Sequence, residues 1–185
     1  MNSDIELIGG PEHRKIILVP YNLKWPEKFI THKNKIKEAL GPLAERVEHI
    51  GSTSLPGMTA KPIIDIQLSI ADVDDEMAYL PQLEKFGYVL RVRERGHRMV
   101  RTPELDVHLH ICSVGSEWER RHLLFRDWLR TNQQDFDAYA KLKNELAEKD
   151  WETMNHYADA KSTLIKEITQ RAEHWAERTN WQPTG

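Results

Sequence analysis

The sequence predicts an α+β fold, in which a mixed or antiparallel sheet with flanking helices precedes a helical C-terminal third. Two observations predict the sheet: apolar and polar residues alternate over 63–70 and again over 106–112, as in strands with one buried face. A third observation predicts the helices, because apolar residues recur at helical spacing from Ser116 onward. We expect a single domain over residues 1–185, with a flexible lead-in over 1–15 and the helical part over 116–178.

The elements before the central strand can be assigned in order. Residues 16–19 read as a short extended segment that Pro20 stops. A helix begins near Trp25-Pro26, since proline is favoured in a first helical turn, and Gly41-Pro42 disturbs its end. Residues 47–50 then form the first strand of the sheet.

Two strands carry the strongest alternation. One face of 63–70 is apolar, while the other holds Asp65 and Gln67. Between the strands we predict a helix over 74–86 and a hairpin over 87–102 that turns at Arg95-Gly96. The inward side of that helix is predicted to hold Met77, Leu80 and Leu83, and the polar face of 106–112 holds Asp106, His108, His110 and Cys112. The polar faces of the two strands could adjoin in one sheet.

The C-terminal part is predicted to contain three helices. Ser116 and Glu119 fit a capping box, in which the serine accepts a backbone N–H and the glutamate reaches back. The buried stripes are Trp118, Phe125 and Trp128 or Leu129 in the first helix, Phe136, Tyr139, Leu142 and Leu146 in the second, and Tyr157, Leu164, Ile165, Ile168, Ala172 and Trp175 in the third.

Composition bounds the partners and the compartment. The net charge of −3 gives no overall basic field, so nucleic acid is not an expected partner. No apolar run reaches the roughly 20 residues that span a bilayer, and the N-terminus lacks the apolar core of a signal peptide, so we expect no membrane partner. One cysteine, Cys112, cannot form an internal disulfide, which favours a cytoplasmic location. Nothing in the sequence indicates the oligomeric state.

The turn Gly51-Ser52-Thr53-Ser54 precedes the central strand. Glycine permits close backbone approach, and short hydroxyl residues with free N–H groups can bind phosphate oxygens, although a plain turn has the same composition. Asp65, between isoleucines, is costly unless it is metal-bound, hydrogen-bonded or paired, for instance with Lys61. Two-metal phosphoryl transfer needs several carboxylates, and Gln67 supplies none. The pattern therefore favours one metal ion or none.

The second polar face offers further ligands. A His-x-His pair such as His108 and His110 can bind one transition-metal ion, because alternate side chains point the same way, but single strand histidines are more often ordinary polar residues. Asp106 could instead supply the missing acid opposite Asp65. The hairpin is rich in arginine, with Arg91, Arg93, Arg95, Arg98 and Arg101. Such a cluster suits either a polyphosphate or nucleic acid, or else a solvated, charge-protected edge, and we favour the edge.

Several segments together resemble the GrpB family, a bacterial group assigned to the nucleotidyltransferase superfamily. They are VPYNLKWPEKF, HIGSTSLPGMTAKPIIDI, HLHI, LLFRDWLR, YAKLKNELA and HYADAKSTLI, and the resemblance spans about residues 17–170. It implies a polymerase-beta-like nucleotidyltransferase fold. Gly51-Ser52 matches the superfamily's Gly-Ser turn and Asp65 its first acid, while Gln67 stands where the second acid belongs and Asp106 is the candidate third acid by position.

The resemblance also implies a cleft built from matching positions. Its candidate residues are His49, Ser52, Thr53, Ser54, Lys61, Asp65, His108 and His110, closed by Arg126, Asp127, Lys143, Tyr157 and Lys161. The expected activity is binding of a nucleotide or another phosphorylated small molecule, with Mg²⁺ or another divalent metal and with metal-assisted nucleotidyl transfer if the protein is catalytic. The alternatives are a non-catalytic binding module that lost the paired acids, and a metal-dependent hydrolase built on His108 and His110.

Overall fold

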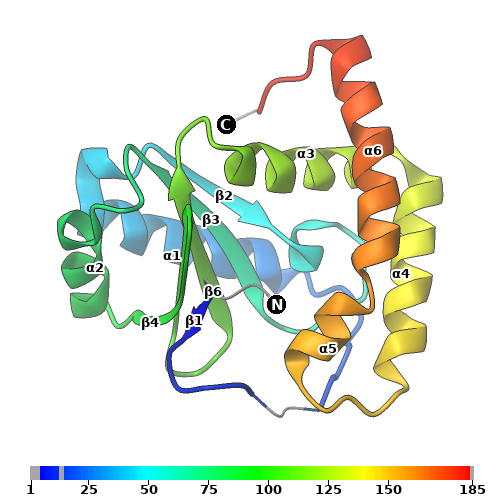
Figure 1. Ribbon diagram of the computed structural model, residues 1–185, viewed down its shortest axis with the longest axis horizontal. Helices are drawn as coiled ribbons and strands as arrows, with labels where there is room; N and C mark the ends of the chain where they lie inside the picture. The colour runs from blue at the N-terminus through cyan, green and yellow to red at the C-terminus, as the bar shows by residue number, and fades with distance from the viewer. Residues whose placement is uncertain (1–4, 13–14, 184–185) are drawn as a thin grey trace.

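A six-stranded sheet lies at the centre of the protein, in a computed structural model that describes residues 5–12 and 15–183 (Figure 1). The elements are β1 (Glu6–Leu7), α1 (Lys24–Leu40), the 3-10 helix η1 (Gly41–Leu43), β2 (Arg46–Ile50), the 3-10 helix η2 (Ser52–Ser54), β3 (Ile64–Ile70), α2 (Glu76–Lys85), β4 (Val89–Glu94), β5 (His97–Arg101), β6 (Val107–Ser113), α3 (Glu117–Thr131), α4 (Gln133–Ala147), α5 (Met154–Asp159) and α6 (Ser162–Thr179). The predicted α+β class, with its helical C-terminal part, is confirmed.

The strands follow the order β1-β4-β5-β6-β3-β2, and only β3 and β6 run parallel to each other. The sheet is therefore mixed and mostly antiparallel. Residue Asp65 of β3 lies opposite His108 of β6, and Gln67 lies opposite His110. This register confirms that the polar faces of the two alternating strands adjoin.

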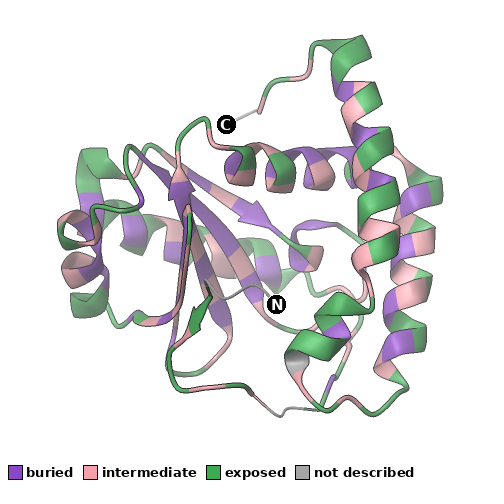
Figure 2. Ribbon diagram, in the orientation of Figure 1, coloured by how far each residue is buried: buried purple, intermediate pink, exposed green. Residues whose placement is uncertain are grey.

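The apolar face of the sheet packs against α1 and α2. Ile64, Ile66 and Leu68 of β3 are fully buried there, together with Ile36 of α1 and Leu83 of α2. Each such side chain contributes roughly 1.5–3 kcal/mol of hydrophobic stabilisation. Figure 2 shows the central strands largely buried and the outward sides of the helices exposed. This face is the main core and leaves the opposite face for polar residues.

The polar face meets the C-terminal helices. Helix α3 packs on β2 and β6, and it joins α4 and α6 in a second apolar cluster that includes Leu124, Ile168 and Ala172. Leu55 and Met58, from the segment after η2, belong to the same cluster. The loop between β2 and β3 is thus clamped between the sheet and the helices, as Figure 1 shows at the right of the sheet.

Three local expectations differ from the structure. Met77 is 79% exposed rather than inward, because Tyr79 takes the buried side of α2 and donates a hydrogen bond to the carbonyl oxygen of Val73. The predicted third C-terminal helix is interrupted after Asp159, so Tyr157 lies in α5. The carboxylate of Glu119 reaches back to the N–H of Gly115, one residue before the predicted partner.

The N-terminal part and the hairpin arginines are tied to the sheet edge. Within the predicted lead-in, Glu6–Leu7 pairs with β4, while residues 1–4 and 13–14 lie outside the described ranges. Arg91 donates to the carbonyl oxygens of Ile8 and Gly10, and Arg93 pairs with Glu76 at 2.7 Å. These contacts favour the charge-protected edge over a polyphosphate site. Among the helices described, none combines the length and apolarity needed to cross a membrane.

Candidate functional site

The turn between β2 and η2 is held by its own side chains. His49 Nε2 lies 2.9 Å from Thr53 Oγ1, which also donates to the carbonyl oxygen of Ile63, and Ser54 Oγ donates to the carbonyl oxygen of Gly51 at 2.6 Å. His49, Thr53 and Ser54 are buried, and burial lowers the pKa of His49 to about 4. These three predicted ligand-binding residues therefore shape the turn. Ser52, which is half-buried, lines a cavity beside Asp65.

Glycine at position 51 allows the turn to approach Asp65. Its φ is +70°, and a Cβ atom there would lie 2.7 Å from Asp65 Oδ2 and 3.0 Å from Asp65 Cβ. Any larger residue would displace the carboxylate or the turn. The Gly-Ser pattern thus has a direct steric reason, which is close contact between the turn and the strand carboxylate.

Two histidines from β6 hold Asp65. Asp65 Oδ1 lies 3.2 Å from His110 Nε2 and 3.5 Å from His108 Nδ1. Burial alone would raise the pKa of Asp65, but the hydrogen bonds from His108 and His110 outweigh it and hold the pKa well below its usual range. One ligand atom of each residue lies within 4.8 Å of the others, so the three can hold a metal ion.

Behind His110 lies a second polar pair that the sequence did not single out. His110 Nδ1 lies 3.1 Å from His97 Nε2, and His97 Nδ1 lies 2.6 Å from Glu94 Oε1. The His97 ring stacks on Trp118 with its centroid 4.0 Å away. His97 and Glu94 flank the hairpin turn, and only the placement of β5 beside β6 brings them to the site.

Gln67, at the position of the expected second acid, is sealed inside the protein. Its side chain is fully buried between Glu48 of β2 and His110 of β6, and neither amide atom finds a hydrogen-bond partner among the described residues. An ionised acid here would be a buried charge, which is costly unless it is paired or metal-bound. With glutamine in place of an acid, this position of the polar face therefore carries no charge and can be fully buried.

The structure does not bring Asp106 to Asp65. It precedes β6 and accepts hydrogen bonds from Lys28 of α1 and from Thr102 Oγ1, the latter at 2.7 Å. Burial favours a raised pKa, but Lys28 and Thr102 lower the pKa of Asp106 overall. A catalytic role for Asp106 therefore has no geometric support from Asp65 or the two histidines.

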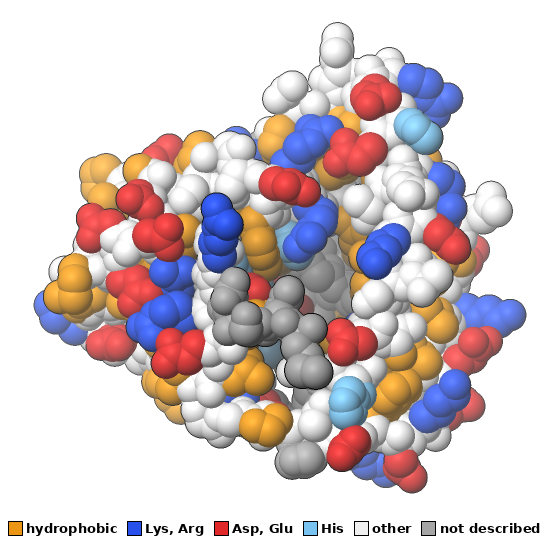
Figure 3. Space-filling model, viewed as in Figure 1, with side chains coloured by type: hydrophobic (Ala, Val, Ile, Leu, Met, Phe, Trp, Pro, Cys, Tyr) orange, Lys and Arg blue, Asp and Glu red, His pale blue; other side chains and the backbone are white. Residues whose placement is uncertain are grey.

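Three lysines converge on a cavity of about 160 Å³ beside Asp65. Lys61 and Lys161 lie over the ring of Tyr157, 5.5 and 4.4 Å from its centroid, and Lys143 Nζ donates to the carbonyl oxygen of Thr59 at 2.5 Å. Gly51, Ser52, Thr53 and His108 line the same cavity. In Figure 3 the surface is hollowed between the sheet and the C-terminal helices, with basic side chains on its rim.

The lysines weaken one another's charge. Burial, followed by repulsion from Lys161 and Lys61, lowers the pKa of Lys143 to about 7. Burial and Lys61 lower the pKa of Lys161 to about 8, although Asp65 opposes this shift. Of the described residues that line the cavity, Asp65 alone carries a carboxylate. The cavity therefore has an excess of positive charge that an anion would relieve.

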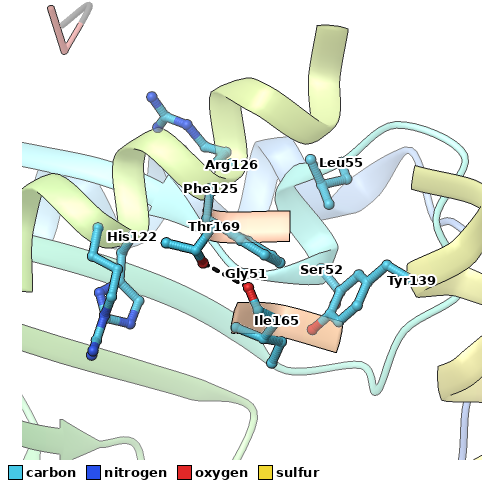
Figure 4. Close-up of a pocket in the computed structure, with 10 residues that line it drawn as sticks. Gly51, Ser52, Leu55, His122, Phe125, Arg126, Tyr139, Ile165 and Thr169 are labelled. Atoms are coloured by element: carbon cyan, nitrogen blue, oxygen red, sulfur yellow. Dashed lines mark hydrogen bonds between the residues drawn. The ribbon is translucent and has the colours of Figure 1, made fainter. Parts of the chain in front are cut away.

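A second cavity, of about 230 Å³, lies on the other side of the turn. Figure 4 shows its walls, to which Phe125 comes from α3, Tyr139 from α4 and Ile165 from α6. Gly51, Ser52 and Tyr139 line both cavities, and burial raises the pKa of Tyr139 to about 12. The sequence did not predict this second, mainly apolar cavity, because its walls come from three separate helices.

Arg126, a predicted ligand-binding residue, lines the second cavity but serves mainly as a structural tie. It is buried, donates to Glu48 at 2.7 Å and to Asp127 at 2.8 Å, and also bonds the carbonyl oxygen of His49. Buried guanidinium groups are normally paired in this way. Arg126 and Asp127 thus join α3 to the end of β2.

Comparisons with known proteins agree with this architecture. A UPF0157 protein of Halalkalibacterium halodurans is 47% identical over 165 residues, which cover 88% of this chain and 85% of that protein. The crystal structure of the conserved protein GrpB from Enterococcus faecalis gives a TM-score of 0.76 at 30% identity, covering 86% of this chain and 99% of that one.

A weaker likeness, to a cytoplasmic RNA terminal U-transferase, has a TM-score of 0.41 at 11% identity over 68% of this chain and 43% of that one, and it carries no argument about function. The family model described as GrpB protein matches residues 15–171, and the resemblance noted in the sequence is confirmed. The chain belongs to the GrpB family.

Proposed function

We propose that the cleft beside Asp65 binds a nucleotide or another phosphorylated small molecule, with its phosphate among Lys61, Lys143 and Lys161. The observation that supports this most is the convergence of three lysines on one cavity with a single lining carboxylate. A phosphate would accept charge-assisted hydrogen bonds from the ammonium groups and relieve their mutual repulsion. The half-buried Ser52 and the backbone of its turn add donors on the opposite wall.

The remainder of the ligand would occupy the second cavity. Gly51, Ser52 and Tyr139 line both spaces, so the spaces adjoin there and one ligand can extend from one into the other. The second space is walled by Leu55, Phe125 and Ile165, which suits a flat, partly apolar group such as a nucleobase. Together the cavities fall at the lower end of the range for small-molecule sites, roughly 300–1,000 Å³.

Metal-assisted nucleotidyl transfer is the second candidate function. It is favoured by the position of Asp65, which lines the lysine cavity and contacts His108 and His110. A divalent metal ion on Asp65 would supply charge neutralisation for the phosphates. The lysines would orient the phosphate chain and Ser52 would donate to it. Because Gln67 is buried and Asp106 is engaged elsewhere, the geometry supports one ion rather than two.

Calorimetric titration tests the binding function. We expect one-to-one binding for at least one member of a panel of nucleoside mono-, di- and triphosphates and pyrophosphate, with Mg²⁺ or Mn²⁺ present. Lys161→Met should weaken it by at least tenfold, whereas Lys166→Met, at an exposed position of the helix that begins directly after Lys161, should not. Absence of binding across the panel, or equal losses in both variants, would contradict the proposal. Release of pyrophosphate from a bound triphosphate would separate transfer from binding alone.

A further inference from the structure

Asp65, His108 and His110 have the donor atoms of a transition-metal site. They offer one carboxylate oxygen and two imidazole nitrogens, from neighbouring positions of paired strands. Nitrogen donors suit Zn²⁺ and similar ions, whereas Mg²⁺ prefers oxygen ligands and keeps several waters. Among the described residues these three form the one group of His, Cys, Asp and Glu that meets the spacing for a metal.

Two of the three distances between the donor atoms match those between ligands of one ion, and the third is at most 4.8 Å. Donors bound to Zn²⁺ at about 2.0–2.2 Å in tetrahedral geometry lie roughly 3.3–3.6 Å apart. Asp65 Oδ1 lies 3.2 Å from His110 Nε2 and 3.5 Å from His108 Nδ1. An ion could therefore enter among these atoms with little movement of the strands.

The hydrogen-bond inventory behind His110 points the same way. The chain Asp65–His110–His97–Glu94 contains three short contacts between polar atoms, and each contact needs one hydrogen. Carboxylates only accept, so the imidazoles must supply these hydrogens, whereas a cation bound between Asp65 Oδ1 and His110 Nε2 would need none at the first contact. His110 Nδ1–H then donates to His97, and His97 Nδ1–H donates to Glu94.

This inventory matches the usual support of metal-binding histidines, which donate their second ring N–H to an acceptor that fixes the ring. His97 is buried and stacked on Trp118, so its orientation is also fixed. On the other side, Gly51 packs against Asp65 Oδ2. Gly51 therefore restricts the carboxylate of Asp65, and His97 restricts the ring of His110.

The remaining coordination positions face the lysine cavity, because Asp65 and His108 both line it. We propose that Asp65, His108 and His110 bind one first-row transition-metal ion such as Zn²⁺, with His97 and Glu94 as positioning residues. The inference deepens the proposed function and rests on it for the phosphate oxygen that completes the coordination. An ion with three protein ligands and an open position is typical of catalytic rather than structural sites.

Co²⁺ and Zn²⁺ provide the test, because Co²⁺ replaces Zn²⁺ and reports its geometry by visible absorption. Chelator-treated protein should bind one Co²⁺ with the intense d–d spectrum of a tetrahedral site, and excess Zn²⁺ should abolish the spectrum. Asp65→Asn and His108→Ala should each lose the spectrum, and His174→Ala, an exposed histidine of α6, should keep it. Circular dichroism would confirm that each variant is folded.

His97→Phe separates positioning from binding, since the ring can still stack on Trp118 but cannot hydrogen-bond His110. We expect one Co²⁺ per chain with an affinity about 10–100-fold weaker. The inference would be overturned if chelator-treated wild-type protein bound no Co²⁺. It would also be overturned if Asp65→Asn and His108→Ala bound Co²⁺ with wild-type affinity. Lys161→Met should retain the ion while losing phosphate affinity. If the protein binds the ion but no phosphate, only the proposed function is contradicted. If it binds phosphate but no ion, only the metal site is contradicted.

Discussion

Lys143 offers the sharpest perturbation of the proposed phosphate site. It is 2% exposed, and its Nζ lies 5.2 Å from the centroid of Tyr139 and donates to the carbonyl oxygen of Thr59. Burial first, and then repulsion from Lys161 and Lys61, lower its pKa from the usual 10.5 to about 7. Lys143→Met keeps much of the length of the side chain and removes its charge. We expect it to weaken anion binding and to change the pH dependence of both binding and stability.

The expected loss of affinity follows from one charged hydrogen bond. Such bonds contribute about 1.5–3 kcal/mol, which corresponds to roughly a 10–150-fold weaker dissociation constant. Sulfate is the appropriate probe for pH dependence, because its charge is constant near neutral pH. An anion favours protonated Lys143, so wild-type affinity should fall as pH rises above about 7, by at most tenfold per pH unit. The variant should fall less steeply.

Stability should depend on pH with the same sign as for an acid whose native pKa is lowered, and with the opposite sign to that of a lysine held in an ion pair. The native pKa of Lys143 lies below its unfolded value, so the unfolded chain binds more protons between the two. The free energy of unfolding therefore falls as pH is lowered from about 10 towards 7. At 1.36 kcal/mol per pKa unit this linkage is at most about 5 kcal/mol. Lys143→Met should remove it, at a pH-independent cost of about 1–3 kcal/mol for the unpaired carbonyl of Thr59.

Calorimetric sulfate titrations at several pH values and urea unfolding at two pH values would measure both effects. Lys141→Met is the matched control, since Lys141 is exposed on the same helix. If sulfate binding to the wild type did not depend on pH, and if Lys143→Met bound sulfate with unchanged affinity, Lys143 would not be an anion ligand. A variant whose stability varies with pH as steeply as that of the wild type would refute the assigned pKa.

Three further substitutions test the site by stability, each measured by urea unfolding. Gly51→Ala should destabilise by about 1–3 kcal/mol and exceed Gly57→Ala, because both residues have positive φ but only the new Cβ at 51 meets Asp65; equal effects would disprove the steric contact. Gln67→Met should stabilise by about 1–3 kcal/mol, since it removes two buried polar atoms that lack described partners; a destabilised variant would show that the amide is satisfied. Arg126→Met should cost about 3–5 kcal/mol, because it leaves Glu48 partly buried without its cation and Asp127 with the more distant Arg130; a loss below 1 kcal/mol would contradict that role.

Much of the fold is predictable from alternation, because one buried face imposes a period of two on β3 and β6. The same pattern placed Asp65, His108 and His110 on polar faces, and the register brought those faces together. Met77 escaped prediction because a tyrosine can take the inward place by hydrogen-bonding its hydroxyl to the backbone. Hydrophobicity alone therefore does not decide whether Met77 or Tyr79 occupies the buried side of α2.

The site was only partly predictable. Lys143 and Lys161 stand far from β3 in sequence, and only the family resemblance indicated them. Glu94 and His97 were missed because their role depends on the order of strands, which no local pattern specifies. The position of Asp106 in sequence suggested a third acid, but the strand begins one residue later and its carboxylate turns to Lys28.

The phosphate of the ligand is proposed to bind in the lysine cavity. A crystal structure with the best-binding nucleotide measures this directly, through the distances from its phosphate oxygens to the lysine nitrogens. We predict hydrogen bonds of about 2.7–2.9 Å to Lys143 Nζ and Lys161 Nζ, with the base beside Phe125 in the second cavity. A nucleotide bound elsewhere, with the lysine cavity left to solvent, would contradict the account.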